Sequence, residues 1–411
     1  MRRFESFKRI SIGDGGILVK MLRMCSTAMV LPGFLWAVGE IPFGDSLNVR
    51  FVGDYSPVYS CRNVKIRWPY AFLCEEEGLE IVDISDPSSP SHVGLCETPF
   101  HYIEDVAISE SSPDYAYASE ETHFDVIKIQ DPSNPFIVAQ SLVYDDGEDI
   151  VCSFPYVYHA VRMDGMLIFD VSDPYHPDSL GNWFVPGHPP GSFAYGVAIY
   201  RQKINKTYAL LACCYSGLRI VDVSDPTNPN EVGMLDKDVF HVTVAGSLAY
   251  LSSAMEGLYV VDISDPYNPY IIGHWNQGGC LRCVVSRLYA YVADYGTGQL
   301  WVIDTSNPAN PQTVGYYDTP GRPRGIAVRR GYIYVSEGDF RIYQFIDDES
   351  PEVTVISPNG GEIFEVGDTC DITWLATDNV GVDSVGILYS TDAGLSWDTI
   401  ATGEPNDSLY E

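Results

Sequence analysis

Basic residues are scarce in this 411-residue chain, which has 24 Lys and Arg against 56 Asp and Glu and a formal net charge of −32. Because a nucleic-acid backbone repels an acidic surface, this balance argues against DNA or RNA as a partner. A surface of this charge keeps a protein in solution. Its more specific interpretation is a cation or a cationic partner.

The common catalytic motifs are also absent. The chain has no G-x-S-x-G, no H-E-x-x-H and no phosphate-binding loop, and its eight histidines are scattered. Glu104 and Glu148 could in principle do acid/base work together, but the sequence does not fix their separation. We therefore predict a protein that is not an enzyme.

Long apolar runs are missing except near the N-terminus. Six Arg and Lys residues precede the uncharged stretch 24–39, which is too short to span a bilayer comfortably and ends in small residues. This pattern predicts an export segment over residues 1–39 and no membrane span in the remaining chain. The expected location is secreted, extracellular or at the cell surface, with the periplasm as the alternative.

Nine cysteines follow the export segment, so at least one thiol has no partner within the chain. Cys280 and Cys283 form a lone C-x-x-C. A metal site would need a second pair or suitably spaced histidines, and a redox motif would open a helix. We expect no cofactor here.

One phrase recurs through the chain. Residues 78–87 read Gly-Leu-Glu-Ile-Val-Asp-Ile-Ser-Asp-Pro. Close copies occupy 165–174, 217–226 and 257–266, weaker ones 126–132 and 300–308, and a degenerate seventh 340–345. The shared prolines recur at intervals of 40 to 52 residues. A period of this size with four strands per unit is typical of a propeller blade.

Each repeat reads as four strands. A first strand such as 241–244 and a second such as 248–251 precede the phrase, and a strand with a Val-Gly pair follows it. Several strands are apolar at consecutive positions, as in sheets packed on both faces. The sequence thus predicts an all-β fold, a seven-bladed β-propeller of four-stranded blades over residues 45–348.

The Ser-Asp-Pro segment has a mechanical explanation. Proline presets the backbone for a turn, and a preceding Asp or Ser can hydrogen-bond the backbone beyond it. We interpret the recurrent aspartates as caps of this turn rather than as cation ligands. They are Asp83, Asp170, Asp222, Asp262 and Asp304.

The last repeat lacks a fourth strand of its own. Residues 51–53 (Phe-Val-Gly) precede the first innermost strand, at 63–66, and are predicted to fill the vacant place in the last blade. That pairing would close the ring and remove two open edges.

The repeated phrase resembles the LVIVD repeat, found in a family of bacterial and archaeal exported or surface proteins with propeller architecture. The resemblance covers residues 50–347. It implies a fold and an envelope location, and it carries no catalytic residues to transfer.

The pattern changes after residue 350. Segments 353–362, 366–368 and 372–374 resemble the opening strands of an immunoglobulin- or fibronectin-like sandwich, so 351–411 is expected to be a truncated β-sandwich-like domain. Residues 390–397 match an Asp-box. This single copy outside the propeller argues against a sialidase.

Propellers usually bind ligands at the mouth of the central channel. The residues just before the innermost strands are carboxylates in the second and third repeats and arginines in the sixth, seventh and first, which predicts a bipolar rim. The candidate ligand-binding residues are Arg62, Glu104, Asp105, Glu148, Asp149, His241, Arg282 and Arg324.

The loops between second and third strands are acidic and should lie on the same face. They could hold Ca²⁺ through oxygen ligands, although solvated loop ends are the plainer interpretation. Three hypotheses follow. The first is a non-enzymatic exported surface protein that binds a protein or glycan. The others are an extracellular hydrolase or lyase acting on a polysaccharide, and a Ca²⁺-dependent adhesin.

Overall fold

The structure, a computed structural model, contains strands and no helix among the residues that it describes. Those residues are 7–12, 15–21, 46–98, 102–143, 145–163, 165–185, 193–202, 206–346, 352–358, 371–377, 385–390, 398–404 and 409–410. Contacts divide the chain into two units. One comprises residues 43–346, and the other comprises residues 1–42 together with 347–411.

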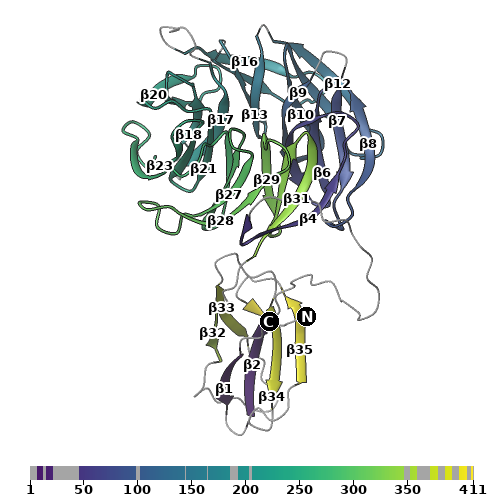
Figure 1. The fold of residues 1–411 in the computed structure, drawn as a ribbon, viewed down its shortest axis with the longest axis vertical. Helices are drawn as coiled ribbons and strands as arrows, with labels where there is room; N and C mark the ends of the chain where they lie inside the picture. The colour runs from purple at the N-terminus through teal and green to yellow at the C-terminus, as the bar shows by residue number, and fades with distance from the viewer. Residues whose placement is uncertain are drawn as a thin grey trace. The chain divides into compact units, whose positions relative to one another are not determined.

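The larger unit is a seven-bladed β-propeller, in which each blade is an antiparallel sheet of four strands or more (Figure 1). Blade 1 consists of β5 (Cys61–Arg67), β6 (Tyr70–Glu75), β7 (Gly78–Asp83) and β8 (Ser91–Glu97). Blade 2 consists of β9 (Ile103–Ser109), β10 (Ser112–Glu120), β11 (His123–Lys128) and β12 (Phe136–Leu142). Blade 3 consists of β13 (Gly147–Ser153), β14 (Tyr156–Val161), β15 (Gly165–Asp170) and β16 (Asp178–Trp183).

The later blades repeat this order. Blade 4 consists of β17 (Gly196–Gln202), β18 (Lys206–Ala212), β19 (Leu218–Asp222) and β20 (Asn230–Leu235). Blade 5 consists of β21 (His241–Ala245), β22 (Leu248–Ser253), β23 (Gly257–Asp262) and β24 (Tyr270–Trp275). Blade 6 consists of β25 (Arg282–Ser286), β26 (Tyr289–Asp294), β27 (Gln299–Asp304), β28 (Gln312–Asp318) and the short β3 (Ser46–Leu47).

Blade 7 closes the ring with a strand from the other end of the chain. It consists of β29 (Gly325–Arg329), β30 (Tyr332–Glu337), β31 (Asp339–Phe345) and β4 (Val49–Tyr55). Strand β4, purple in Figure 1, runs antiparallel to β31, in green. The predicted closure by residues 51–53 is therefore confirmed. The first strands of successive blades contact one another all the way round, from β5 to β29 and back to β5.

The core lies between neighbouring blades. Second strands such as β6 and β26 are buried along almost their whole length, because blades cover both of their faces. Each buried cluster mixes residues of two adjacent blades. One example joins Phe72 and Ile81 of blade 1 to Val106 and Ile127 of blade 2. Burial of this apolar surface is what holds a ring of separate sheets together.

The recurrent aspartates cap the turn after the third strand, as the sequence predicts. Asp83 Oδ1 accepts a hydrogen bond from the Ser85 backbone N–H at 2.7 Å, and Asp262 accepts one from Ser264 at 2.8 Å. The same bond occurs at Asp170, Asp222 and Asp304. These carboxylates are thus turn-forming groups, and the proline that follows ends the strand.

A glycine in the fourth strand receives this turn from the next blade. A methyl group built on Gly273 of blade 5 would lie 1.9 Å from the carbonyl oxygen of Pro308 in blade 6. The same clash with a turn proline of the following blade arises at Gly53, Gly94, Gly181 and Gly233. Blade 2 carries Ala139 at the equivalent register position. The Val-Gly strand therefore marks an inter-blade contact.

The smaller unit contains two antiparallel sheets. One is formed by β1 (Phe7–Ile12), β2 (Gly15–Met21), β34 (Val385–Ser390) and β35 (Asp398–Glu404). The other is formed by β32 (Glu352–Ser357), β33 (Ile372–Thr377) and β36 (Leu409–Tyr410). Buried Trp374 and Ile387 belong to one hydrophobic cluster of this unit.

Two sequence predictions fall in this part of the chain. Residues 7–12 and 15–21, placed within the export segment, form β1 and β2, and β2 pairs with β34. The uncharged stretch 24–39 and most of the Asp-box lie outside the described residues. The export segment and the immunoglobulin-like assignment stay predictions.

The glycine contact predicts a specific loss of stability. Gly273→Ala should lower the free energy of unfolding by about 1–3 kcal/mol, because the new methyl group forces the Pro308 turn away. Ala139→Gly is the matched control and should cost less than about 1 kcal/mol, since that position already accommodates a methyl group. Urea denaturation measures both, and an unchanged midpoint for Gly273→Ala would contradict the contact.

Candidate functional site

The predicted site residues lie at one end of the channel, which we call the mouth. It is the end where the innermost strand of each blade begins. Arg62, Glu104, Glu148 and Arg324 occupy equivalent positions at this end, and Asn63, Asp105, Asp149, His241 and Arg282 are each one residue further along their strands. The structure divides these residues into groups with different roles.

Asp105, Asp149 and Arg282, together with Lys65, form an ion cluster across the channel. Arg282 Nη1 of blade 6 lies 3.4 Å from Asp149 Oδ1 of blade 3 and 3.9 Å from Asp105 Oδ2 of blade 2. Lys65 Nζ of blade 1 lies 3.0 Å from Asp105 Oδ2. Because blade 6 stands opposite blades 2 and 3 in the ring, we call these four side chains the channel cluster.

The carboxylates of the channel cluster also accept hydrogen bonds from neighbouring blades. Asp105 Oδ1 accepts a hydrogen bond from Asn63 Nδ2 at 2.6 Å, and Asp149 Oδ2 accepts one from the Val197 N–H at 2.8 Å. Burial raises the pKa of Asp105 to about 7, although Lys65 opposes the shift. These residues are therefore part of the ring's internal structure rather than free ligand groups.

Glu104 and Glu148 lie nearer the mouth and each forms an ion pair. Arg62 pairs with Glu104, and Arg162, which the sequence analysis did not single out, pairs with Glu148. Burial raises the pKa of both carboxyls, that of Glu148 to about 7. The charges of the predicted bipolar rim are thus partly neutralised by ion pairs at the mouth.

His241 lies inside blade 5, next to blade 6. It hydrogen-bonds to Cys283, its Nδ1 has no hydrogen-bond partner within the described part of the chain, and burial lowers its pKa. The thiols of Cys280 and Cys283 are both buried and free, with Cys280 Sγ 3.0 Å from Ser252 Oγ. His241 is thus neutral and directed at a thiol.

Two of the predicted residues, Arg62 and Arg324, line a polar pocket at the mouth of about 200 Å³. We call it the arginine pocket. It lies where blades 6, 7 and 1 meet, and its lining residues are Ser60, Cys61, Arg62, Glu76, Tyr295, Arg322, Arg324, Glu337 and Gly338.

Arg322 and Arg324 both lie against one tyrosine of this pocket. Their guanidinium carbons are 5.3 Å and 5.0 Å from the centre of the Tyr295 ring. The hydrogen bond from Arg324 and the charges of both arginines lower the pKa of Tyr295. Among the described residues, neither arginine has a carboxylate within ion-pair distance, although acidic residues outnumber basic ones more than two to one.

The acidic loop ends have a structural role that the sequence interpretation missed. In blades 1, 6 and 7, a buried carboxylate at the end of the second strand accepts a backbone N–H group from the loop that enters the innermost strand. Glu75 binds Tyr59 N at 3.1 Å, Asp294 binds Gly279 N at 3.0 Å and Glu337 binds Gly321 N at 3.0 Å. Within the described residues, no three His, Cys, Asp or Glu side chains group in a way that could hold a metal ion.

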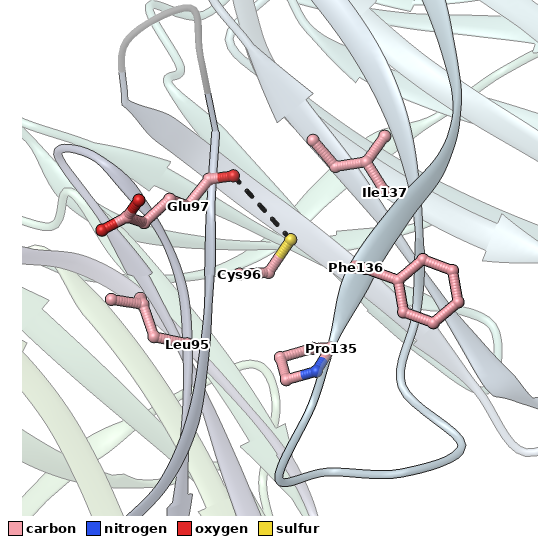
Figure 2. Close-up of a pocket in the computed structure, with 6 residues that line it drawn as sticks. All are labelled: Leu95, Cys96, Glu97, Pro135, Phe136 and Ile137. Carbon is pink, nitrogen blue, oxygen red and sulfur yellow. Dashed lines mark hydrogen bonds between the residues drawn. The ribbon is translucent and has the colours of Figure 1, made fainter.

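A second pocket, of about 280 Å³, lies on the outer side of blades 1 and 2. Figure 2 shows Cys96 pointing toward the segment of Pro135 and Ile137, while Leu95 and Glu97 point away. Burial raises the pKa of the Cys96 thiol. The pocket presents apolar surface and no facing ion, so the arginine pocket is the better candidate site.

Sequence reasoning missed Arg322, Tyr295, Arg162 and Lys65. A signal for the first was available, because Arg322-Pro323-Arg324 puts two of the chain's 24 basic residues within three positions. The others could not be found from repeat alignment. The partners of Lys65 and Tyr295 lie on neighbouring blades, and Arg162 itself lies beyond the aligned strands, just after β14.

The channel cluster predicts a large cost for removing its arginine. Arg282→Met should destabilise the propeller by about 3–5 kcal/mol, because two buried aspartates lose a charge partner. The double variant with Asp149→Asn should recover part of that loss. A single variant as stable as the parent in urea denaturation would show that Arg282 is not needed.

The buried carboxyl group of Glu120 should make the stability of the fold depend on pH. Burial raises its pKa to about 9, with a further contribution from Asp125. The folded chain therefore keeps a proton that the unfolded chain releases above about pH 4.3, and stability falls as pH rises between these values. Glu120→Gln should remove this loss, so its urea midpoint should gain on the parent between about pH 5 and about pH 9. Parallel midpoints would contradict the assignment.

Comparison with known proteins agrees with the fold. Comparison with curated proteins finds no match. The β-propeller domain of Cps50 (Swd1) from Myceliophteria thermophila superposes with a TM-score of 0.58 at 10% identity, covering 72% of this chain and 99% of that one. The computationally designed Ika8 protein gives 0.52 at 8% identity, covering 84% and 98%. At these identities the likeness concerns the fold alone.

The repeats themselves match a family model. The LVIVD repeat model matches residues 60–98, 102–142, 146–183, 203–237, 236–277 and 280–319, which together make up more than half of the chain. These six matches correspond to blades 1 to 6, and the unmatched blade 7 contains the degenerate copy at 340–345. The chain belongs to the LVIVD repeat family.

Proposed function

We propose that the protein is a non-enzymatic binding protein of the cell envelope, whose propeller holds an anionic group of its ligand in the arginine pocket. The observation that carries this proposal is the pair Arg322 and Arg324, which line a polar pocket without carboxylate partners among the described residues. A guanidinium binds carboxylate, sulfate or phosphate through paired, charge-assisted hydrogen bonds.

The envelope location rests on the sequence. The basic N-terminal residues and the uncharged stretch 24–39 support export, and the two small sheets of the other unit are compatible with a sandwich-like appendage. No helix in the described part of the chain is long and apolar enough to cross a membrane.

The two alternatives receive less support from the geometry. A hydrolase needs free carboxyls facing a substrate, whereas Glu104 and Glu148 are held by Arg62 and Arg162. A Ca²⁺ adhesin needs free oxygen ligands. The carboxylates of Glu75, Asp294 and Glu337 already accept protein N–H groups.

Binding of a small anion tests the proposal. Glucuronate, titrated against the full chain and followed by NMR or calorimetry, should bind, and Arg322→Gln and Arg324→Gln should each weaken it by about tenfold or more. Arg329→Gln, at the far end of β29 on an exposed side chain, is the matched control and should have no effect. Equal affinity in all variants, or no binding of glucuronate and phosphate to the parent, would refute the proposal.

A further inference from the structure

The mouth carries a second distinctive surface, on blades 4 and 5. Tyr195 and Phe240 occupy the positions that Arg62 and Arg324 hold in blades 1 and 7, immediately before the innermost strands begin. Their ring centres are 5.5 Å apart, and Phe193 contacts Tyr195 edge-on at 6.0 Å. With Tyr215 these residues form what we call the aromatic patch.

The aromatic patch is open to a ligand. Tyr215, in the connection between β18 and β19, is 64% exposed, and the other three rings are half-buried. Tyr215 follows Cys214, whose backbone N–H donates to the carbonyl of Val239 at 2.9 Å, next to Phe240. Burial chiefly, with smaller effects from Glu148 and Tyr215, raises the pKa of Tyr195. Half-buried tyrosines offer an apolar face and a hydroxyl side by side.

The arginine pocket is too small for a whole ligand. Its volume of about 200 Å³ is below the roughly 300 Å³ at which pockets begin to enclose a drug-sized molecule. It can therefore take one end group of a larger ligand, whose remainder would then lie outside the pocket, over the mouth. Leu281 of blade 6 stands at the equivalent position between Phe240 and Arg324, so this position carries an apolar side chain rather than a charged one.

The overall charge limits what that ligand can be. A net charge of −32 repels a polyanion at long range, and Arg322 and Arg324 supply positive groups at the mouth that have no ion pair among the described residues. The site therefore favours a ligand with a single anionic end and an uncharged remainder. Aromatic rings suit the C–H faces of sugar rings, and tyrosine hydroxyls can bond to sugar hydroxyls.

We infer that the ligand is a neutral oligosaccharide with one acidic terminal sugar, its carboxylate in the arginine pocket and its neutral sugars over the aromatic patch. This inference rests on the proposed function, and it adds the chemical class of the ligand and a second contact surface. The two surfaces have separable contributions, because the patch and the pocket lie on different blades.

The test compares three probes on the full chain by calorimetry. They are glucuronate, a neutral oligosaccharide that ends in one glucuronate, and a polyglucuronate. The capped oligosaccharide should bind about tenfold or more tighter than glucuronate, and added salt should weaken it. The polyglucuronate should bind more weakly than the capped oligosaccharide at low salt, because the acidic protein repels it.

Variants separate the two surfaces. Tyr215→Ala, an exposed position that folding does not depend on, should abolish the gain of the oligosaccharide over glucuronate and leave glucuronate affinity unchanged. Arg324→Gln should weaken both probes. Tyr267→Ala, an exposed tyrosine on the turn after β23, is the matched control and should change neither.

The outcomes distinguish the two proposals. If glucuronate binds but the oligosaccharide gains nothing, or the polyglucuronate binds best, the inference is overturned and the arginine pocket stands. A fourth probe is a peptide whose only charged group is its C-terminal carboxylate. If this peptide binds more tightly than the oligosaccharide, the ligand class is wrong. If no probe binds, the proposed function itself fails.

Discussion

The architecture depends on one contact that recurs between neighbouring blades. In this contact, the proline turn of one blade packs against a glycine in the fourth strand of the blade before it. The carbonyl of Pro308 lies so close to Gly273 that no side chain fits between them, and the same arrangement recurs at four other blade junctions. Each strand pairing shifts register beside this glycine, for example between Val260 and Val261 in blade 5. The repeated phrase forms the turn, and the Val-Gly strand supplies the glycine that the turn packs against. The two sequence features are therefore the two sides of one inter-blade contact.

Buried charge is the second constraint on the ring. Small side chains along the innermost strands would leave the channel open. Arg282 instead extends from blade 6 to Asp149 and Asp105 on the opposite side. Such buried charges are tolerated because the carboxylates also accept hydrogen bonds from other donors, as Asp149 does from the Val197 N–H. The charged groups inside the channel thus pair with one another. Arg322 and Arg324 at the mouth have no carboxylate partner among the described residues.

Much of the fold follows from local pattern, and much of the site does not. The period of the proline turn predicts the blades, and the aspartate caps follow from bonding within two residues, so Asp83 and Asp262 are where the sequence puts them. The closing strand at residues 51–53 follows from counting strands. The partners of Arg282 depend on which blades face one another across the channel, and that of Arg62 on which blades are neighbours. Glu75 and Glu337, which read as solvated loop ends, are buried because the incoming loop folds over them.

Closure by β4 fixes the order in which the molecule can be completed. Most sheet contacts join segments within one repeat, but Val49 pairs with Phe345, at the far end of the propeller sequence. Strand β4 precedes the innermost strand of every blade in the chain but acquires its partner β31 last, so blade 7 stays incomplete while the other six are already whole. A chain cut just before β31 would contain six whole blades and still present two unpaired strand edges, on β30 and β4. The ring can therefore close only in a chain that extends to the end of β31.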